Sequence, residues 1–164
     1  GDFGPEYDAL WEKASPKFDF VAERKRVYLE WKYRKPPHLR YDVFEARRES
    51  GRDLTGYVVL RTAVRNGVRL ALLVDVFADP EDKETLGALL DRAIEYTREA
   101  SAARLQSFTF DRRIAGRLLA KGFLLIASPM QFCVRIKGGV DPRFFRDTSR
   151  WHVTFGDSDQ DREV

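Results

Sequence analysis

The chain has 164 residues, of which 43% are hydrophobic and 34% charged; this predicts one folded domain and excludes a disordered or collagen-like chain. One cysteine and two histidines exclude a disulfide framework and a Cys/His zinc site, and no apolar run approaches the ~20 residues that span a membrane. The net charge of +3 is small, which argues against nucleic acid as a partner, and we expect a cytoplasmic protein.

The first third of the chain predicts two helices. Pro5 suits a first helical turn, and apolar residues recur at helical spacing from Tyr7 to Ala14, before Ser15-Pro16 ends the helix. A second helix is expected over residues 23–34. Its 3.6-residue spacing predicts an inward face that comprises Val27, Tyr28 and Trp31.

Three strands in hairpin succession are expected next. Residues 41–48 alternate, with Phe44 and Ala46 on one face, and residues 54–64 form a longer strand in which Gly56 can mark a bulge. Asn66-Gly67 between two apolar strands indicates a type I′ turn. The following strand, 68–78, is apolar on both faces, which predicts a central strand covered on each side.

The second half alternates helices and strands. We expect a helix over residues 83–101, a strand over 104–110, a helix capped by Asp111 that ends at Lys121-Gly122, and two strands over 123–127 and 131–137. The whole order predicts an α/β fold: a mixed, mainly antiparallel twisted sheet with helices on both faces.

This order of elements is similar to the GNAT fold of acyl-CoA-dependent N-acyltransferases. The resemblance rests on the central strand 70–78 with the Pro80 turn, on the helix opening Leu86-Gly87-Ala88-Leu89-Leu90, and on the junction Leu118-Leu119-Ala120-Lys121-Gly122-Phe123. It implies a GNAT-like domain over residues 1–156.

Two further stretches look like parts of certain bacterial proteins that carry a GNAT domain in their C-terminal half. They are Tyr28-Leu29-Glu30-Trp31-Lys32-Tyr33 with the proline pair after it, and the ending from Trp151 to Asp159. The chain does not begin with Met, so we expect a domain cut from a longer protein and truncated at its N-terminus. Residues 157–164 are then an acidic flexible tail.

The resemblance implies transfer of an acyl group, such as acetyl, from acyl-CoA to a primary amine by direct attack in a ternary complex. In the family, the central strand's backbone pairs with the pantetheine arm, and a glycine-rich loop at the next helix N-terminus binds the pyrophosphate. The residues at these positions are Val76, Phe77 and Ala78 on the strand, and Lys83, Leu86, Gly87 and Ala88 at the helix. The loop departs from the family pattern, because only one of its glycines is present and four carboxylates surround it.

Asp75 is the expected catalytic base, because the family often has a carboxylate on or near the central strand. Its apolar neighbours predict a raised pKa, which suits a base. The alternative is that Asp75 accepts hydrogen bonds from a neighbouring backbone or an arginine. The tyrosine that serves as acid in the family is replaced by Leu118; Cys133 could release a proton or be a small buried hydrophobe.

The resemblance also places the first two helices beside the acceptor site. Trp31, Tyr33 and Arg34 are the candidate substrate-binding residues, because aromatic rings stack on sugars and arginine binds carboxylates. The implied acceptor is a small-molecule or sugar amine. No metal site is expected: the spacing Asp157-x-Asp159 opens like a calcium loop, but Arg162 stands where glycine is required.

Two other functions stay open at this point. The first is a non-catalytic GNAT-like domain that packs on a missing N-terminal domain or forms a homodimer, which the degraded loop favours. The second is a Fem-type aminoacyl or peptidyl transferase, which has a related fold but takes its acyl group from tRNA.

Overall fold

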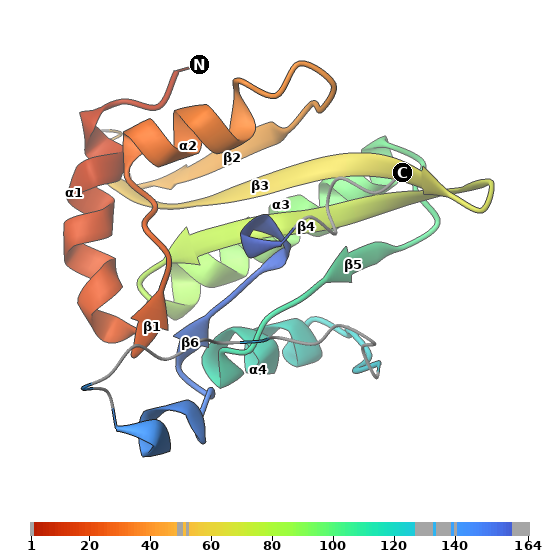
Figure 1. The fold of residues 1–164 in the computed structure, drawn as a ribbon. Helices are drawn as coiled ribbons and strands as arrows, with labels where there is room; N and C mark the ends of the chain where they lie inside the picture. Colours follow the sequence, from red (N-terminus) through yellow and green to blue (C-terminus); the bar gives the residue numbers. More distant parts are fainter. Residues whose placement is uncertain are drawn as a thin grey trace.

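The computed structural model describes residues 2–48, 51, 53–126, 133, 139 and 141–158. Figure 1 shows the arrangement of its elements in space. In chain order they are α1 (Pro5–Ala14), η1 (Ser15–Lys17), β1 (Phe20–Val21), α2 (Arg26–Tyr33), β2 (Asp42–Arg47), β3 (Leu54–Arg65), β4 (Val68–Ala78), α3 (Lys83–Glu99), β5 (Leu105–Ser107), α4 (Arg112–Ala120), η2 (Pro142–Phe145), β6 (Trp151–His152) and η3 (Phe155–Asp157).

The main sheet has the order β2-β3-β4-β5. Its first three strands are antiparallel, and β5 is parallel to β4 because α3 connects them. Asn66 and Gly67 join β3 to β4 with positive φ angles of 51° and 75°, which confirms the predicted turn. A separate parallel pair joins β1 to β6, so residues 20–21 and 151–152 lie side by side.

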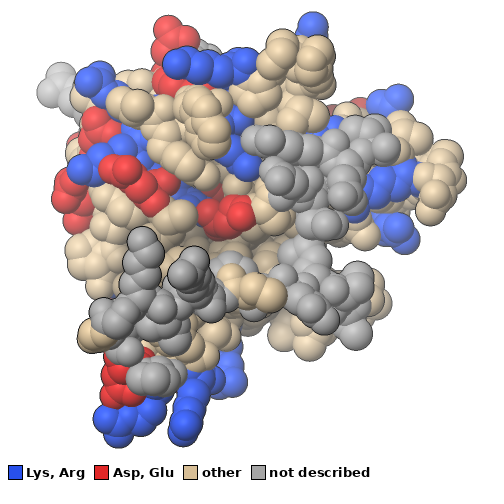
Figure 2. Space-filling view, viewed as in Figure 1, with Lys and Arg blue, Asp and Glu red and all other residues tan. Residues whose placement is uncertain are grey.

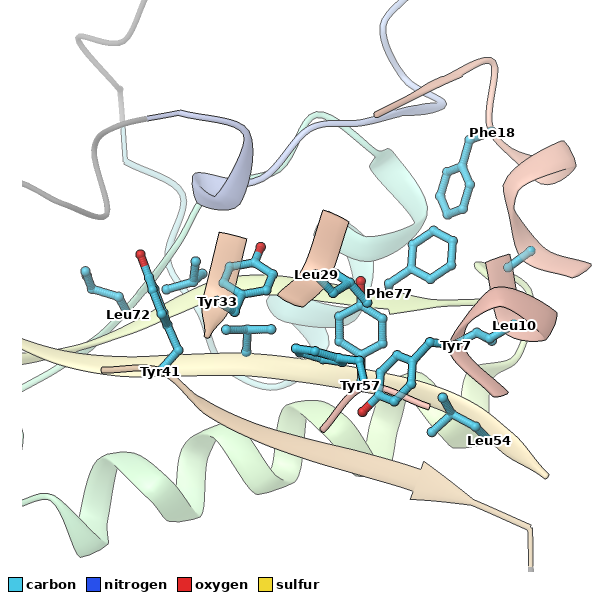
Figure 3. Packing of buried hydrophobic residues seen from close by; sticks show 14 of the residues in the cluster. Tyr7, Leu10, Phe18, Leu29, Tyr33, Tyr41, Leu54, Tyr57, Leu72 and Phe77 are labelled. Atoms are coloured by element: carbon cyan, nitrogen blue, oxygen red, sulfur yellow. The ribbon is translucent and has the colours of Figure 1, made fainter. Parts of the chain in front are cut away.

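Helices pack on both faces of this sheet, as predicted. On one face, α1 and α2 bury an aromatic cluster in which Tyr7, Tyr57 and Phe77 lie close together (Figure 3), with the Tyr7 and Tyr57 ring centroids 5.4 Å apart. On the other face, α3 packs its apolar stripe, which includes Leu86 and Leu90, against the sheet. The fold is therefore α/β, with the central strand β4 covered on each side.

Gly56 lies where β3 passes closest to α3. A Cβ at this position would lie 2.8 Å from Ala78 Cβ and 2.9 Å from side-chain atoms of Leu89 and Thr85. The register of β2 against β3 also shifts at this point, which confirms the irregularity that was predicted here. Glycine is required because the helix approaches the strand too closely for any side chain.

The predicted inward face of α2 is wrong for Val27 and Trp31, whereas Tyr28 is partly buried against the core. Val27 is 74% exposed and Trp31 55% exposed, whereas Leu29 and Tyr33 are buried. Both sets have helical spacing, so periodicity alone does not choose between them. The sheet-facing stripe consists of Leu29 and Tyr33, four residues apart, which places Trp31 on the outer side.

Both ends of α4 follow the predicted signals. Asp111 accepts a hydrogen bond from Arg113 N–H at the start of α4, and Gly122 has a φ of 88° just after its end. The strand expected over 104–110 is shorter, and residues 123–126 form no strand. The other expected strand lies outside the described residues apart from Cys133, which is exposed, so the expectation of a buried hydrophobe is wrong.

In the part of the chain that the structure describes, no helix is long and apolar enough to cross a bilayer.

Candidate functional site

A bulge interrupts the central strand β4. Val59 of β3 lies opposite Asp75, but the next residue, Leu60, lies opposite Leu73, so Val74 is an extra residue in β4. The pairing of β4 with β5 also stops at Leu73. Beyond this point β4 continues to its end at Ala78 without a strand neighbour on that side among the described residues.

The ladder with β3 determines which main-chain groups point to this unpaired edge. Ala71 N–H donates to Arg104 O, so Ala71 faces β5. The direction of the main-chain groups alternates along a strand. After the bulge Phe77 pairs with Tyr57, and in this register the main-chain groups of Phe77 face β3. The main-chain N–H and C=O groups of Val76 and Ala78 therefore point away from β3, toward the unpaired edge.

Asp75, beside the bulge, is the centre of a buried polar network. Its side chain is completely buried. Arg24 Nε lies 3.2 Å from Asp75 Oδ2, the Tyr33 hydroxyl donates to the same oxygen at 3.2 Å, and the Thr154 hydroxyl donates to Oδ1 at 3.1 Å. Arg24 Nη2 also donates to Asp157 Oδ2 at 2.6 Å. One buried arginine therefore links two carboxylates from β4 and η3.

The prediction that the pKa of Asp75 is raised is wrong. Burial favours the neutral acid, but the positive charge of Arg24 outweighs it and holds the pKa of the Asp75 carboxyl well below its usual range. The geometry bears out the alternative stated above, that Asp75 accepts hydrogen bonds from an arginine. A proton acceptor in catalysis needs an oxygen that the substrate can reach, and both oxygens of Asp75 are occupied.

The C-terminal segment, defined here as residues 149–157, lies between β4 and the chain after β5, where the two strands no longer pair. At its start Ser149 O accepts a hydrogen bond from Arg112 N–H of α4. Further along, the Phe155 ring lies 5.9 Å from the ring of Phe108, just after β5. Gly156 lies against β4, since its Cβ would be 3.4 Å from Val74 O. Figure 1 shows this segment passing between α4 and the C-terminal half of β4.

Negative charge surrounds the N-terminus of α3, where the resemblance places a pyrophosphate. Asp82 caps the helix, with its Oδ1 accepting from Thr85 N–H at 3.0 Å. Lys17 Nζ lies 2.7 Å from Asp79 Oδ2 and 3.2 Å from Glu81 Oε2. The protein's own carboxylates therefore occupy the helix terminus, where a bound anion would otherwise lie.

The four candidate residues at this terminus divide between two environments. Leu86 is 1% exposed, and its side chain belongs to the core beneath α3. Lys83 and Ala88 are exposed, and Gly87 has open space where a Cβ would stand. Lys83, Gly87 and Ala88 are thus on the accessible surface of the helix, whereas Leu86 is not. The side chains of Val76, Phe77 and Ala78 are all buried, which leaves only their main-chain groups for a ligand.

The three candidate acceptor residues do not lie together. Tyr33 points inward to Asp75, and Arg34 is exposed, with its guanidinium 5.3 Å from the centre of the Phe3 ring. Trp31 lies on the outer side of α2 beside Tyr28, at a ring-centroid distance of 5.7 Å. These two rings line a hollow of about 410 Å³ with the charged residues Asp8, Glu23, Lys25 and Arg26, and with Val27.

Acidic and basic side chains are interspersed around this hollow. Arg26 Nε lies 3.3 Å from Asp8 Oδ2, and Lys25 Nζ lies 2.9 Å from Glu12 Oε1. Figure 2 shows the same mixture over the part of the surface that α1 and α2 form. The surface beside Trp31 therefore offers aromatic rings among charges of both signs.

Sequence reasoning missed Arg24, Thr154 and Asp157. Arg24 was one of several charges in a run, and nothing local marks it as the buried one. The expectation that Asp157 belongs to a flexible tail is wrong. Its side chain is 11% exposed and forms an ion pair with Arg24. Thr154 N–H donates to Asp157 Oδ2 at 2.9 Å. The spacing Thr-x-x-Asp is a helix-start signal that could have identified this turn. Residues 159–164 lie outside the described part.

Among the described residues, no group of three or more His, Cys, Asp and Glu side chains is arranged to hold a metal ion.

No family model and no curated protein sequence matches the chain. Similar solved structures exist, however. The chain is similar to a probable acetyltransferase with a TM-score of 0.55 and 19% identity, over 82% of this chain and 90% of the other. It is similar to a ribosomal-protein-alanine N-acetyltransferase from Brucella melitensis biovar Abortus 2308 (TM-score 0.54, 18% identity, over 80% of this chain and 91% of the other).

A third similar structure is an aminoglycoside acetyltransferase from an uncultured soil metagenomic sample, in complex with trehalose. Its TM-score is 0.54 and its identity 14%, over 80% of this chain and 87% of the other. At such identities the likeness shows the fold alone. The chain has the GNAT fold, which confirms the architecture that its element order resembles.

Proposed function

We propose that the chain transfers an acyl group from acyl-CoA to the primary amine of a small molecule. The observation that carries this proposal is the unpaired edge of β4 beyond the Val74 bulge. The main-chain N–H and C=O groups of Val76 and Ala78 are directed to that edge, where an extended chain could form hydrogen bonds with them as a further strand would. A pantetheine arm contains two amides in an extended chain, so it can pair with such an edge.

The nucleotide end of acyl-CoA is proposed to lie over the start of α3, along Lys83, Gly87 and Ala88. Gly87 leaves room for close approach, and Lys83 supplies a positive charge. The carboxylate of Asp82 weakens this site because like charges at ~4 Å cost several kcal/mol at low dielectric. We therefore expect weaker cofactor binding than a helix terminus free of carboxylates would give.

The acceptor is proposed to be a small-molecule or sugar amine. Among the similar structures is an enzyme named for aminoglycosides, which are amines of this kind. The proposed recognition surface is the hollow beside Trp31, where Glu23 can pair with an ammonium group and the rings of Tyr28 and Trp31 can stack on a sugar. Tyr33 and Asp75 contribute behind it by holding the bulge in place.

The proposed reaction is direct attack of the neutral amine on the thioester carbonyl. The amine nitrogen forms a bond to the carbonyl carbon and gives up one proton, the carbon–sulfur bond breaks, and the CoA thiolate that leaves takes up one proton to become a thiol. Asp75 is a positioning residue in this proposal, because its charge holds Arg24 and Tyr33 beside the bulge. The proton acceptor is therefore a group other than Asp75.

A transfer assay tests the proposal. The protein is mixed with acetyl-CoA and a panel of amino sugars, aminoglycosides and polyamines, and release of free CoA thiol is followed. We expect thiol release that requires both protein and amine, and that falls in Trp31→Ala. The matched control Val27→Ala removes a side chain from the same hollow but no ring. No release with any amine, combined with no binding of acetyl-CoA, contradicts the proposal.

A second candidate, a non-catalytic GNAT-like domain, would account for one observation. Asp82 caps α3 with its own carboxylate, so the position of the ligand's phosphate is already filled. The absence of acetyl-CoA binding in the same assay is the outcome that this candidate predicts.

A further inference from the structure

We infer that residues 154–157, here called the strap, cover the bulge of β4 in the resting protein and move aside when the acyl donor binds. This inference rests on the proposed function, because it concerns the same unpaired edge. A donor arm that runs along Ala78 and Val76 reaches Val74 with its thioester. The strap lies against that residue, since a Cβ on Gly156 would be 3.4 Å from Val74 O.

The strap fills the space between the two strands that diverge. The Thr154 hydroxyl donates to Asp75 Oδ1 on β4, whereas the Phe155 ring contacts Phe108 just after β5. Thr154 and Phe155, adjacent in the strap, thus contact the two strands that diverge, one on each side. An acyl chain that occupied this space would meet Thr154, Phe155 and Gly156 unless they moved.

Polar contacts hold the strap in place. Arg24 Nη2 pairs with Asp157 Oδ2, and the Thr154 hydroxyl donates to Asp75. When the strap moves away, water or ligand replaces the lost partner in both contacts. The apolar anchor of the segment lies before the strap: Trp151 is 1% exposed and packs 4.8 Å from the Phe20 ring. The segment can therefore open at its far end while Trp151 stays docked.

Two buried polar atoms in and beside the strap have no hydrogen-bond partner among the described residues. They are Asp157 Oδ1 and His152 Nδ1, whereas His152 Nε2 lies 3.5 Å from Asp75 Oδ1. Buried polar groups without partners disfavour the state that buries them. The closed state of the strap is thus less stable than its burial suggests, which is what a cover that a ligand displaces requires.

Covering the bulge lowers the apparent affinity for the donor. If only a fraction of the molecules has the strap open, the observed Kd is the intrinsic Kd divided by that fraction. Loosening the strap must therefore tighten donor binding, whereas loosening a wall of the binding site would weaken it. This opposite sign separates a displaceable cover from a fixed part of the site.

The test combines hydrogen exchange of the free protein with acetyl-CoA titration of wild type, Asp157→Asn and Gly156→Ala. The first variant weakens the ion pair to Arg24, and the second places a methyl group 2.4 Å from the Tyr33 hydroxyl. Asp91→Asn, which removes an exposed ion pair to Lys121 on the outer side of α3, is the control. We expect faster amide exchange over residues 154–157 in both strap variants, unchanged exchange in β3 and β4, and roughly tenfold tighter acetyl-CoA binding.

The outcomes distinguish the two claims. Unchanged exchange of residues 154–157 in both variants, or exchange that rises equally in β4, overturns the strap whatever acetyl-CoA does. Faster local exchange with equal or weaker binding also overturns it, because the segment is then part of the donor site. Faster local exchange with no acetyl-CoA binding in any of the proteins overturns the proposed function instead.

Discussion

Arg24 and Asp157 lie 133 positions apart in the sequence, and their side chains form an ion pair of 2.6 Å between Nη2 and Oδ2. Arg24 is 1% exposed and also contacts Asp75 on the central strand. This arginine therefore ties the residues just before α2 and the C-terminal segment to the bulge of β4. The site has its shape because three distant parts of the chain share one buried positive charge.

Replacing Arg24 by methionine leaves the buried Asp75 carboxylate without its cation. Removal of one partner of a buried ion pair costs about 3–5 kcal/mol, so Arg24→Met should lower the free energy of unfolding by that amount in urea titrations. Arg26→Met is the control, because its pair with Asp8 is exposed and worth about 0–1 kcal/mol. A loss below about 1 kcal/mol in Arg24→Met would contradict the network.

The depressed pKa of Asp75 predicts acid sensitivity. A carboxyl whose pKa is lower in the folded than in the unfolded protein stabilises the fold above the unfolded value, about 3.9, and loses that contribution as the pH falls below it. Urea titrations at pH 5, 4 and 3 should show a steep loss of stability in wild type and a shallower one in Asp75→Asn. Equal slopes in the two proteins would show that Asp75 is not held ionised by Arg24.

Gly56 and Gly87 should respond in opposite directions to alanine. At Gly56 the new methyl group meets Ala78 and Leu89 within 3 Å, so Gly56→Ala should destabilise by about 1–3 kcal/mol. At Gly87 there is open space within a helix, so Gly87→Ala should stabilise by about 0.4–1 kcal/mol. Thermal unfolding measures both, and a loss of stability in Gly87→Ala contradicts the open surface of α3.

The two tryptophans Trp31 and Trp151 should differ sharply in their contribution to stability. Trp31 is 55% exposed, so Trp31→Ala should change the free energy of unfolding by no more than about 0.5 kcal/mol. Trp151 is 1% exposed among aromatic rings, so Trp151→Ala should cost about 3–5 kcal/mol. Similar losses in both variants would mean that the corrected orientation of α2 is wrong.

Local patterns predicted most of the fold. The bounds of β4 agree residue for residue with the prediction, because the apolar run Leu70–Val74 lies between a turn at Asn66-Gly67 and a break at Pro80. The predicted inward face of α2 was wrong because two sets of its residues have the same helical spacing. The set that packs against the sheet contains Leu29 and not Trp31. Periodicity gives the pitch of a helix but not which side the tertiary structure covers.

The site was less predictable than the fold. Asp75 stood out as a carboxylate among apolar residues, but the sign of its pKa shift depends on Arg24, which is 51 positions away. Apolar sequence neighbours indicate burial, and only the three-dimensional structure shows whether an opposite charge is buried beside it. The role of Asp157 was missed for the same reason, since its partner lies at the other end of the chain.

In the proposed function, the edge of β4 beyond the bulge binds the arm of an acyl donor. The most direct measurement is a thermal-unfolding titration with acetyl-CoA, with adenosine 3′,5′-bisphosphate as the ligand that lacks the arm. We expect saturable stabilisation by acetyl-CoA, about 2.7 kcal/mol at 100 times its Kd, and a much smaller effect of the bisphosphate. No shift with acetyl-CoA up to millimolar concentration, in wild type and in Asp157→Asn alike, would contradict the claim.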